Sequence, residues 1–265
     1  MIELNTIYNE DCLVGMAEIP DKSVDMILCD LPYGTTACSW DTIIPFEPLW
    51  EQYKRVIKDN GAIVLTASQP FTTTLINSNF NGMKHIWYWN KENGGNFAVA
   101  KYMPQKVIEE IVVFSKDGQR VNYYPIMEDV EKGKVRPINR PMKRKESNPQ
   151  GMASGIIKAS DNYSNKKRHP KNVLTFNNRA RELNSSKRVH PTQKPVALFE
   201  YLIKTYTKEG ETVLDNCMGS GTTAIAAINT GRNYIGYELD PDYHSIAEER
   251  IANHVAVADE KETIK

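Results

Sequence analysis

One stretch near the carboxyl-terminal end of the chain predicts a strand, a glycine-containing loop, a helix and a second strand in succession. Residues 212–215 are typical of a short strand, Gly219 and Gly221 follow it, and residues 222–229 have helical character. Residues 234–238 are typical of a second strand. Two strands joined through a helix run parallel, because the crossover returns the chain to the same end of the sheet. This stretch therefore predicts a βαβ unit of an α/β fold.

The loop and the second strand of this unit carry groups that suit a nucleoside. Glycines let the backbone approach a ligand closely, and the start of a helix offers unpaired N–H groups to an anion. Glu238 ends the second strand, 17 residues after Gly221, and an acidic residue about 20 residues beyond such a loop typically binds a ribose diol. Ala224 stands where a dinucleotide loop most often has its third glycine. The unit by itself leaves NAD and S-adenosylmethionine open as cofactors.

The same alternation of strands and helices extends over most of the chain. Further strands are predicted at residues 24–29, 62–67, 85–89, 110–114 and 173–176. Further helices are predicted at residues 46–57, 70–77, 195–206 and 243–254, the first of them ended by Asn60-Gly61. Strands that alternate with helices predict a mainly parallel sheet with helices on both faces.

Composition and cysteine spacing bound the class of protein. Apolar residues make up 40% of the 265 residues, enough for a core. The apolar runs are shorter than the ~20 residues of a membrane span, and no signal-peptide pattern opens the chain, so we expect a cytoplasmic protein without a membrane partner. Cys12, Cys29, Cys38 and Cys217 form no CxxC pair and show no zinc spacing. We therefore expect neither structural disulfides nor a metal site.

The net charge of zero hides a strong asymmetry between two parts of the chain. Residues 116–188 contain 18 Lys and Arg against 7 Asp and Glu, a net charge of +11, which leaves −11 for the remainder. A basic block on an acidic body is typical of a region that binds a polyanion such as nucleic acid. A solvated insertion is the alternative explanation, because runs of charge are often solvent-exposed.

A second motif, Asp30-Leu31-Pro32-Tyr33, follows directly after the predicted strand 24–29. It places a carboxylate, a rigid turn and an aromatic ring at the carboxyl end of that strand, the edge at which α/β sheets bind ligands. An acceptor beside an aromatic face suits a flat ring that carries an amino group, such as a nucleobase. The alternative is an ordinary proline turn.

Taken together, the two motifs resemble those of the amino-group DNA methyltransferases, whose signatures are a (D/N/S)PPY-type tetrapeptide and a DPFxGSGTT-type loop. The first corresponds to Asp30-Leu31-Pro32-Tyr33 and the second to the run from Asp215 to Thr223. His190-Pro191-Thr192-Gln193-Lys194-Pro195 is similar to the HPTxKP element of the family, and Trp89-Asn90-Lys91 to its W-x-K segment. The tetrapeptide precedes the basic region and the cofactor loop follows it, which resembles the β-type motif order.

The resemblance implies a Rossmann-like S-adenosylmethionine-dependent methyltransferase sheet with helices on both faces. Residues 1–115 and 189–255 would form the catalytic and cofactor-binding domain, residues 116–188 a basic target-recognition insertion, and residues 256–265 a frayed tail. Double-stranded DNA would be the partner, and a homodimer is possible by analogy. The resemblance implies no metal, because the methyl group of the sulfonium is already activated.

The resemblance also assigns roles to individual residues. Asp30 and the backbone carbonyl of Leu31 would accept hydrogen bonds from the target amino group, Pro32 would fix the turn, and Tyr33 would stack on the target ring. Leu31 departs from the usual proline of the family. The cofactor-binding residues implied by the resemblance are Asp11, Cys12, Thr192, Lys194, Asp215, Cys217, Gly219, Ser220, Gly221, Thr222, Thr223 and Glu238.

The first residue of the tetrapeptide favours adenine as the target, because aspartate goes mostly with adenine N6 in the family and serine mostly with cytosine N4. We therefore predict a site-specific DNA adenine-N6 methyltransferase of the restriction-modification type that acts on a flipped base. Cytosine-N4 methylation, an RNA or protein target, a catalytically silent DNA-binding module and an NAD-dependent oxidoreductase are the alternatives.

Overall fold

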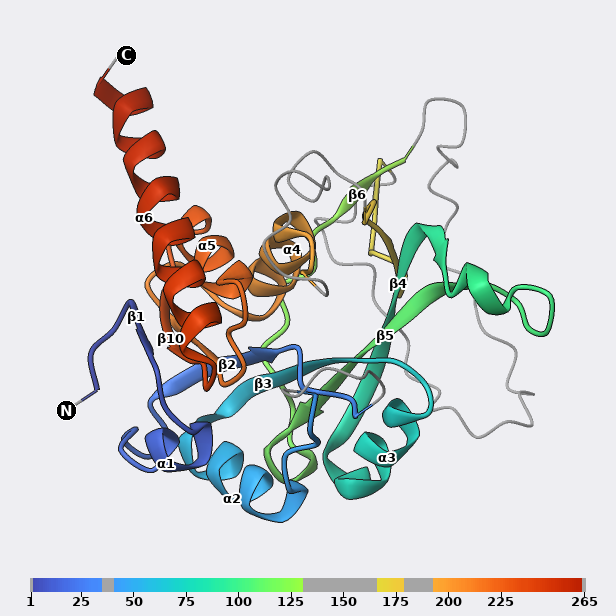
Figure 1. Ribbon diagram of the computed structural model, residues 1–265, viewed down its shortest axis with the longest axis horizontal. Helices are drawn as coiled ribbons and strands as arrows, with labels where there is room; N and C mark the ends of the chain where they lie inside the picture. The colour runs from blue at the N-terminus through green and yellow to red at the C-terminus, as the bar shows by residue number, and fades with distance from the viewer. Residues whose placement is uncertain (1, 35–40, 131–165, 179–192, 264–265) are drawn as a thin grey trace, which may run out of the picture. The chain divides into compact units, whose positions relative to one another are not determined.

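A computed structural model describes residues 2–34, 41–130, 166–178 and 193–263 of the chain. The chain divides into two units, one of Met1–Tyr124 with Asn172–Lys265 and one of Pro125–Lys171. The first unit contains an eight-stranded sheet with helices on both faces (Figure 1). It therefore has the predicted α/β fold.

Among the described residues, seven of the eight strands of this sheet run in one direction, and only β5 runs antiparallel to its neighbours. In sheet order the strands are β1 (Thr6–Tyr8), β10 (Asn233–Tyr237), β9 (Thr212–Asp215), β2 (Val24–Cys29), β3 (Ile57–Ala67), β5 (Lys106–Ser115), β4 (Met83–Gly95) and β8 (Val173–Thr175). The chain proceeds from β2 to β3 on one side and from β9 to β10 on the other. The boundary between β2 and β9 is therefore the point where the winding reverses, which is where doubly wound sheets bind ligands.

The helices form two layers, one on each face of the sheet (Figure 1). One layer consists of α1 (Cys12–Met16), α2 (Phe46–Val56) and α3 (Phe71–Ser78), and the other of α4 (Val196–Tyr206), α5 (Thr222–Asn229) and α6 (Pro241–Thr263). Strand β2 is buried on both sides, because Met26 and Leu28 join one hydrophobic core and Ile27 and Cys29 the other. A strand covered on both faces is apolar at nearly every position rather than at alternate ones, and in β2 only Asp25 departs from this. Each large apolar side chain buried in this way stabilises the fold by ~1.5–3 kcal/mol.

The connection between α2 and β3 differs from the prediction. Helix α2 ends at Val56, and β3 begins at Ile57, so Asn60-Gly61 lies inside a strand rather than at a helix end. A Cβ on Gly61 would lie 2.8 Å from the carbonyl oxygen of Asp25. The glycine is therefore required for the close approach of β3 to β2, where the strand pairing is irregular.

The final helix also differs from the prediction. Helix α6 runs from Pro241 to Thr263, so residues 256–263 are helical and do not form the frayed tail that we expected. No helix within the described ranges is long and apolar enough to cross a membrane.

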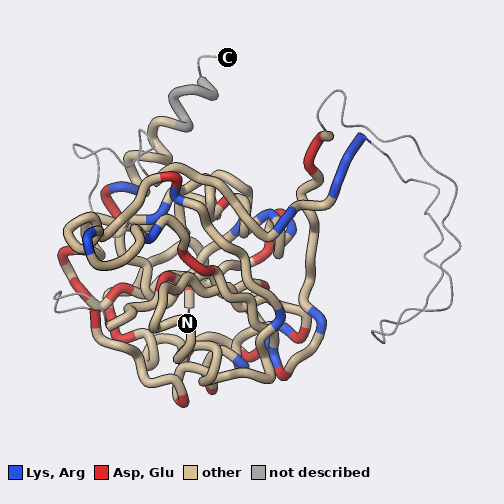
Figure 2. The backbone as a smooth tube through the Cα atoms, turned by 90° about the vertical axis from the view of Figure 1, so that its right-hand side faces the viewer, with Lys and Arg blue, Asp and Glu red and all other residues tan. Residues whose placement is uncertain are grey.

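The second unit has a small two-stranded sheet in its described part. Strand β6 (Glu128–Asp129) pairs antiparallel with β7 (Lys167–Arg168), an acidic segment beside a basic one (Figure 2). An ion pair joins Arg168 Nε to Glu128 Oε2 at 2.7 Å. A cross-strand pair of opposite charges of this kind stabilises the pairing by only ~0.2–1 kcal/mol. Residues 131–165 and 179–188, which hold most of the basic residues of the predicted recognition insertion, lie outside the described residues.

Candidate functional site

A cavity of about 820 Å³ lies at the carboxyl ends of the parallel strands of the first unit. Asp30 follows β2, Asp215 ends β9 and Glu238 follows β10, and all three line the cavity. They come from distant parts of the sequence and meet because parallel strands end at the same edge of a sheet. The cavity also lies at the boundary between β2 and β9, as the topology requires.

The Asp30 carboxylate accepts hydrogen bonds from three side chains. The hydroxyl of Tyr33 donates to Oδ1 at 2.8 Å, the hydroxyl of Thr66 donates to the same oxygen, and Lys194 Nζ donates to Oδ2 at 2.6 Å. Thr66 reaches Asp30 because Cys29 pairs with Leu65, which puts the next residues of β2 and β3 level with each other. The carboxylate is thus held in one orientation at the cavity wall.

The turn after Pro32 is fixed from the other side by Asp41. Its Oδ1 accepts the backbone N–H of Tyr33 at 2.7 Å and that of Gly34 at 2.8 Å. The Tyr33 ring stacks on Phe71, with the ring centroids 5.0 Å apart. Burial and the nearby negative charges raise the pKa of the Tyr33 hydroxyl well above its ordinary value. Tyr33 therefore stays protonated and remains a donor to Asp30.

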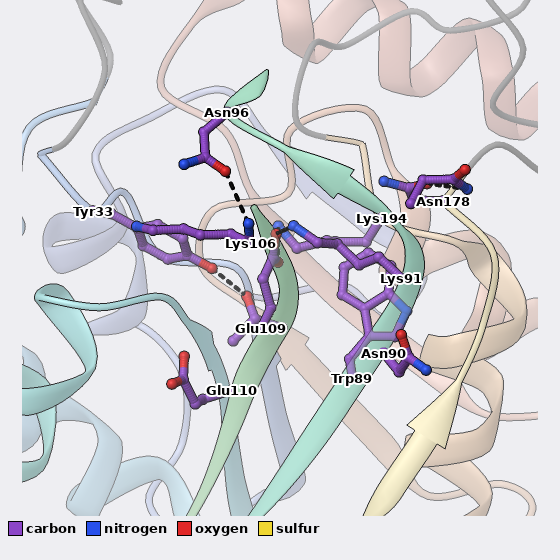
Figure 3. A network of polar contacts seen from close by, with 12 residues as sticks. Tyr33, Trp89, Asn90, Lys91, Asn96, Lys106, Glu109, Glu110, Asn178 and Lys194 are labelled. Carbon is purple, nitrogen blue, oxygen red and sulfur yellow. Dashed lines mark hydrogen bonds and ion pairs between the residues drawn. The ribbon is translucent and has the colours of Figure 1, made fainter. Parts of the chain in front are cut away.

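Four charged side chains that line the cavity, Lys91, Glu109, Lys194 and Asp30, form a row of ion pairs. Figure 3 shows Lys91, Glu109 and Lys194 of this row. Lys91 Nζ lies 2.9 Å from Glu109 Oε1, Lys194 Nζ lies 3.8 Å from Glu109 Oε2, and Lys194 also pairs with Asp30. Burial alone would lower the pKa of Lys194, but the carboxylates of Asp30 and Glu109 outweigh it, so the pKa is raised. Lys194 is therefore a cation, and the row balances two positive charges with two negative ones.

Asp215 is buried at the end of β9, where it organises the start of the next loop. Its Oδ1 accepts the backbone N–H of Cys217 at 3.0 Å, and its Oδ2 accepts the hydroxyl of Thr223 from α5. Burial raises the pKa of Asp215 to about 6, although these hydrogen bonds act in the opposite direction. The carboxylate ties the two ends of the glycine loop together.

The two glycines of this loop have different surroundings. Both have positive φ, +53° at Gly219 and +79° at Gly221. A Cβ on Gly219 would meet only the carbonyl oxygen of Cys217, at 4.0 Å, so open space lies above it. A Cβ on Gly221 would lie 3.3 Å from Ala247 of α6. Gly219 lines the cavity whereas Gly221 does not, and Gly221 instead lets α5 and α6 approach each other.

Glu238 is held at the mouth of the cavity by two backbone groups. Its Oε2 accepts the N–H of Gly219 at 2.7 Å and its Oε1 accepts the N–H of Asp240 at 2.9 Å. Burial raises the pKa of Glu238 in spite of these two donors. A carboxylate oxygen has two acceptor sites, so each oxygen of Glu238 keeps one for a ligand.

Asp11 and Cys12 lie at the start of α1 and also line the cavity. Asp11 caps this helix by accepting the N–H of Leu13 at 2.8 Å. The amide of Asn216 donates to the Cys12 sulfur at 3.5 Å, and Asn216 Oδ1 accepts the hydroxyl of Tyr53. Asn216 thus joins α1, α2 and the loop after β9 into one wall.

The structure brings most of the predicted site residues together. Among those described, every residue except Gly221 lines the cavity, while Thr192 lies outside the described residues. The sequence prediction missed three polar residues that line the cavity or contact the site, Asp41, Thr66 and Glu109. Lys91 and Asn216 lie in motifs that the sequence analysis named, but it assigned them no role. Thr66 could have been found from its place near the end of the predicted strand 62–67. Glu109 could not, because its strand is antiparallel.

Comparison with known proteins decides the family. The family model for N6/N4 methyltransferases, described as DNA methylase, matches residues 24–249. The chain belongs to this family of DNA methylases. It is therefore a DNA methyltransferase of the N6-adenine or N4-cytosine type, and S-adenosylmethionine is its cofactor, as the resemblance implied. The NAD-dependent alternative is thereby excluded.

Individual relatives of the methylase cover nearly its whole length. It is 27% identical to the type II methyltransferase M1.MboII of Moraxella bovis, with 92% of this chain and 95% of the relative aligned. It is 28% identical to the DNA adenine methyltransferase YhdJ of Escherichia coli K12, with 95% and 85% aligned.

Solved structures share the fold of the methylase. The M1.HpyAVI–S-adenosylmethionine complex has a TM-score of 0.59 at 22% identity, covering 93% of this chain and 98% of that one. The cytosine-N4-specific PvuII DNA methyltransferase has a TM-score of 0.60 at 15% identity, covering 94% and 90%. These likenesses confirm the predicted methyltransferase fold.

Proposed function

We propose that this methylase transfers a methyl group from S-adenosylmethionine to the N6 amino group of an adenine in DNA. The observation that carries the proposal is that Asp30 lies in the same cavity as the glycine loop and Glu238. Aspartate at the first position of the tetrapeptide favours adenine, and one relative is named as a DNA adenine methyltransferase. The named cytosine-N4 specificity of the PvuII enzyme keeps cytosine N4 as the second candidate.

The residues around the loop fit the cofactor. Glu238, with one acceptor site left on each oxygen, would bind the ribose hydroxyls, and the open backbone at Gly219 would adjoin the methionine part. Asp11 and Cys12 would contact the adenine part, and Thr222 and Thr223 begin the helix that follows the loop. The cofactor supplies a methyl carbon bound to a positively charged sulfur.

The chemistry requires a better nucleophile than an ordinary exocyclic amino group, whose lone pair is delocalised into the ring. Asp30 and the carbonyl of Leu31 would accept the two N–H groups and stabilise the positive charge that develops on nitrogen. The nitrogen lone pair would form the new N–C bond while the C–S pair stays on sulfur, which leaves as the neutral thioether S-adenosylhomocysteine, and the nitrogen would then release one proton to solvent. The residues of the chain thus contribute orientation and charge stabilisation.

The departure at Leu31 has a structural counterpart. Its side chain is 4% exposed and belongs to the hydrophobic core on the α1–α3 side. Packing of this side chain would hold the backbone carbonyl in place where the family pattern has a proline. We infer that Leu31 replaces the rigidity of a ring with that of a packed core residue.

The target base would leave the duplex to reach this cavity. Flipping costs a few kcal/mol, and stacking on Tyr33 would return ~1–3 kcal/mol of that. The basic residues between 116 and 188 would bind the phosphates of double-stranded DNA. A DNA substrate is consistent with the predicted cytoplasmic location. A homodimer remains a proposal from analogy.

The test is to incubate the protein with methyl-labelled S-adenosylmethionine and DNA, and then to digest the DNA to nucleosides. Label in N6-methyl-2′-deoxyadenosine is expected, and label only in N4-methyl-2′-deoxycytidine would refute the adenine assignment. Asp30→Ala should abolish transfer while cofactor binding persists. A wild-type protein that binds DNA and cofactor without any transfer would favour the silent binding module.

A further inference from the structure

Four charged side chains form the row along the cavity wall: Lys91, Glu109, Lys194 and Asp30. The proposed chemistry gives a role to Asp30 and none to the other three. The side chains of Lys194, Lys91 and Glu109 are only 8%, 12% and 17% exposed, so the row is largely shielded from water. Lys91 comes from β4, Glu109 from β5 and Lys194 from the segment before α4. Three separate parts of the chain thus bring charges to the place where the target amino group is proposed to bind.

Lys194 already occupies the two positions that the target base would take. Its ammonium donates to Asp30 Oδ2 at 2.6 Å, where the amino group would donate. The same nitrogen lies 5.8 Å from the centroid of the Tyr33 ring, the ring on which the base would stack. Tyr33 and Thr66 fill both acceptor sites of Oδ1, so the amino group of the base would have to share Oδ2 with the ammonium while Lys194 stays there.

The charge of Lys194 gives a second reason for it to move. The amino nitrogen gains positive charge as the methyl group arrives, and an ammonium hydrogen-bonded to the same carboxylate would repel it. The buried surroundings strengthen this repulsion compared with that in water. A second negatively charged group within reach would let the ammonium withdraw without losing its partner.

Glu109 is that group. Its Oε2 is buried, has no hydrogen-bond partner among the described residues, and lies 3.8 Å from Lys194 Nζ. A movement of the ammonium by about 1 Å would bring the pair to hydrogen-bond distance. Lys91 bonds to the other oxygen at 2.9 Å and so keeps the Glu109 carboxylate in place.

We infer that Lys194 stands in for the target amino group on Asp30, and that Glu109 is the positioning residue that receives the Lys194 ammonium when the base enters. The inference rests on the proposed function, because it takes Asp30 as the acceptor of the target amino group. Glu109 and Lys194 thereby act as a two-position element of the active site. A purely structural role of the row would affect folding but not the entry of the base.

The decisive variant is Glu109→Gln, with Glu110→Gln as the matched control. Glu110 is the next residue of the same strand, accepts a hydrogen bond from Thr72 at 3.2 Å and does not line the cavity. Single-turnover methyl transfer is measured at saturating DNA and cofactor, together with cofactor affinity by calorimetry. Entry of the base is followed by the fluorescence of 2-aminopurine at the target position, once sequencing of modified DNA has located it.

The inference predicts that Glu109→Gln slows single-turnover transfer by about 10²-fold, the loss typical of removing one group that supports a charged transition state. The 2-aminopurine signal should also fall, whereas the cofactor affinity should stay within about threefold of the wild-type value. Glu110→Gln should match the wild type in all three measurements. Glu109→Asp, which keeps the charge, should recover part of the rate.

A second variant guards against loss of folding. Glu109→Gln leaves the largely shielded Lys91 ammonium without its ion-pair partner, which can impair folding. The double variant Lys91→Gln with Glu109→Gln removes both charges, so it should fold and should still transfer methyl groups slowly. If Glu109→Gln, alone or together with Lys91→Gln, transfers methyl groups at a rate within about threefold of the wild type, the inference is refuted. Failure of the proposed function is distinct, because the wild-type protein itself would then methylate no DNA.

Discussion

Asparagine in place of Asp215 removes a buried ionisable group from the end of β9, and the effect on stability can be worked out from its pKa. The carboxyl group has a pKa of about 6 in the folded protein, raised by burial from the ordinary 3.8. Between these two values the folded protein binds more protons than the unfolded chain, so its free energy of unfolding falls as the pH rises. A difference of roughly two pKa units corresponds to about 3 kcal/mol.

Asparagine is neutral at every pH and still offers an acceptor to the backbone N–H of Cys217. The wild type loses stability through this group as the pH rises, and the variant does not. The free energy of unfolding of Asp215→Asn minus that of the wild type should therefore increase by up to about 3 kcal/mol from pH 4 to pH 7. Urea denaturation at a series of pH values, followed by tryptophan fluorescence and circular dichroism, measures this difference. A difference that stays constant over this range would refute the raised pKa.

Thr223→Val provides a related test of the same site. The Thr223 hydroxyl donates to Asp215 Oδ2 and lowers the pKa of that carboxyl group. Removal of the donor should raise the pKa further, so the loss of stability with rising pH should extend to higher pH than in the wild type. The same denaturation series detects the shift, and an unchanged midpoint of the pH dependence would contradict it.

Three further predictions concern the cavity. Gly219→Ala and Gly221→Ala should each lower the free energy of unfolding by about 1–2 kcal/mol, because φ is positive at both positions. Only Gly219→Ala should weaken S-adenosylmethionine binding in calorimetry. Equal weakening by both variants would contradict the different surroundings of the two glycines. Thr66→Val removes a donor to Asp30, and single-turnover transfer should slow by about 10- to 100-fold, since such a bond is worth ~1.5–3 kcal/mol. Tyr33→Phe keeps the ring and should retain the 2-aminopurine signal. Tyr33→Ala loses ~1–3 kcal/mol of stacking energy and should lose the signal. Equal signals from the two variants would rule out stacking on Tyr33.

Strand and helix positions in the sheet domain could be predicted wherever the pattern was continuous. The strand at 24–29 has the predicted bounds, because a strand buried on both faces is apolar at nearly every position, here all but Asp25. Residues 212–215 and 222–229 likewise form the predicted strand and helix. Short elements were missed: β1 has three residues and α1 five, too few for a periodic signal.

Asn60-Gly61 shows how a local signal misleads. The pair is typical of a turn or a helix end, and the prediction treated it in this way. Its glycine is needed instead because β2 approaches within 2.8 Å of the position of a Cβ. That contact joins residues far apart in the sequence, so only the folded arrangement reveals it.

The sequence by itself determined the family resemblance, the parallel βαβ units and the carboxylates Asp30, Asp215 and Glu238 that end or follow three strands. Parallel strands end at one edge, so the direction of the chain was enough to bring these groups together. The tertiary structure alone decided the role of Glu109. Its strand β5 runs antiparallel, so the beginning of that strand, and not its end, lies at the functional edge beside Lys194. The direction of β5 depends on its pairing with β3 and β4, which no local pattern encodes.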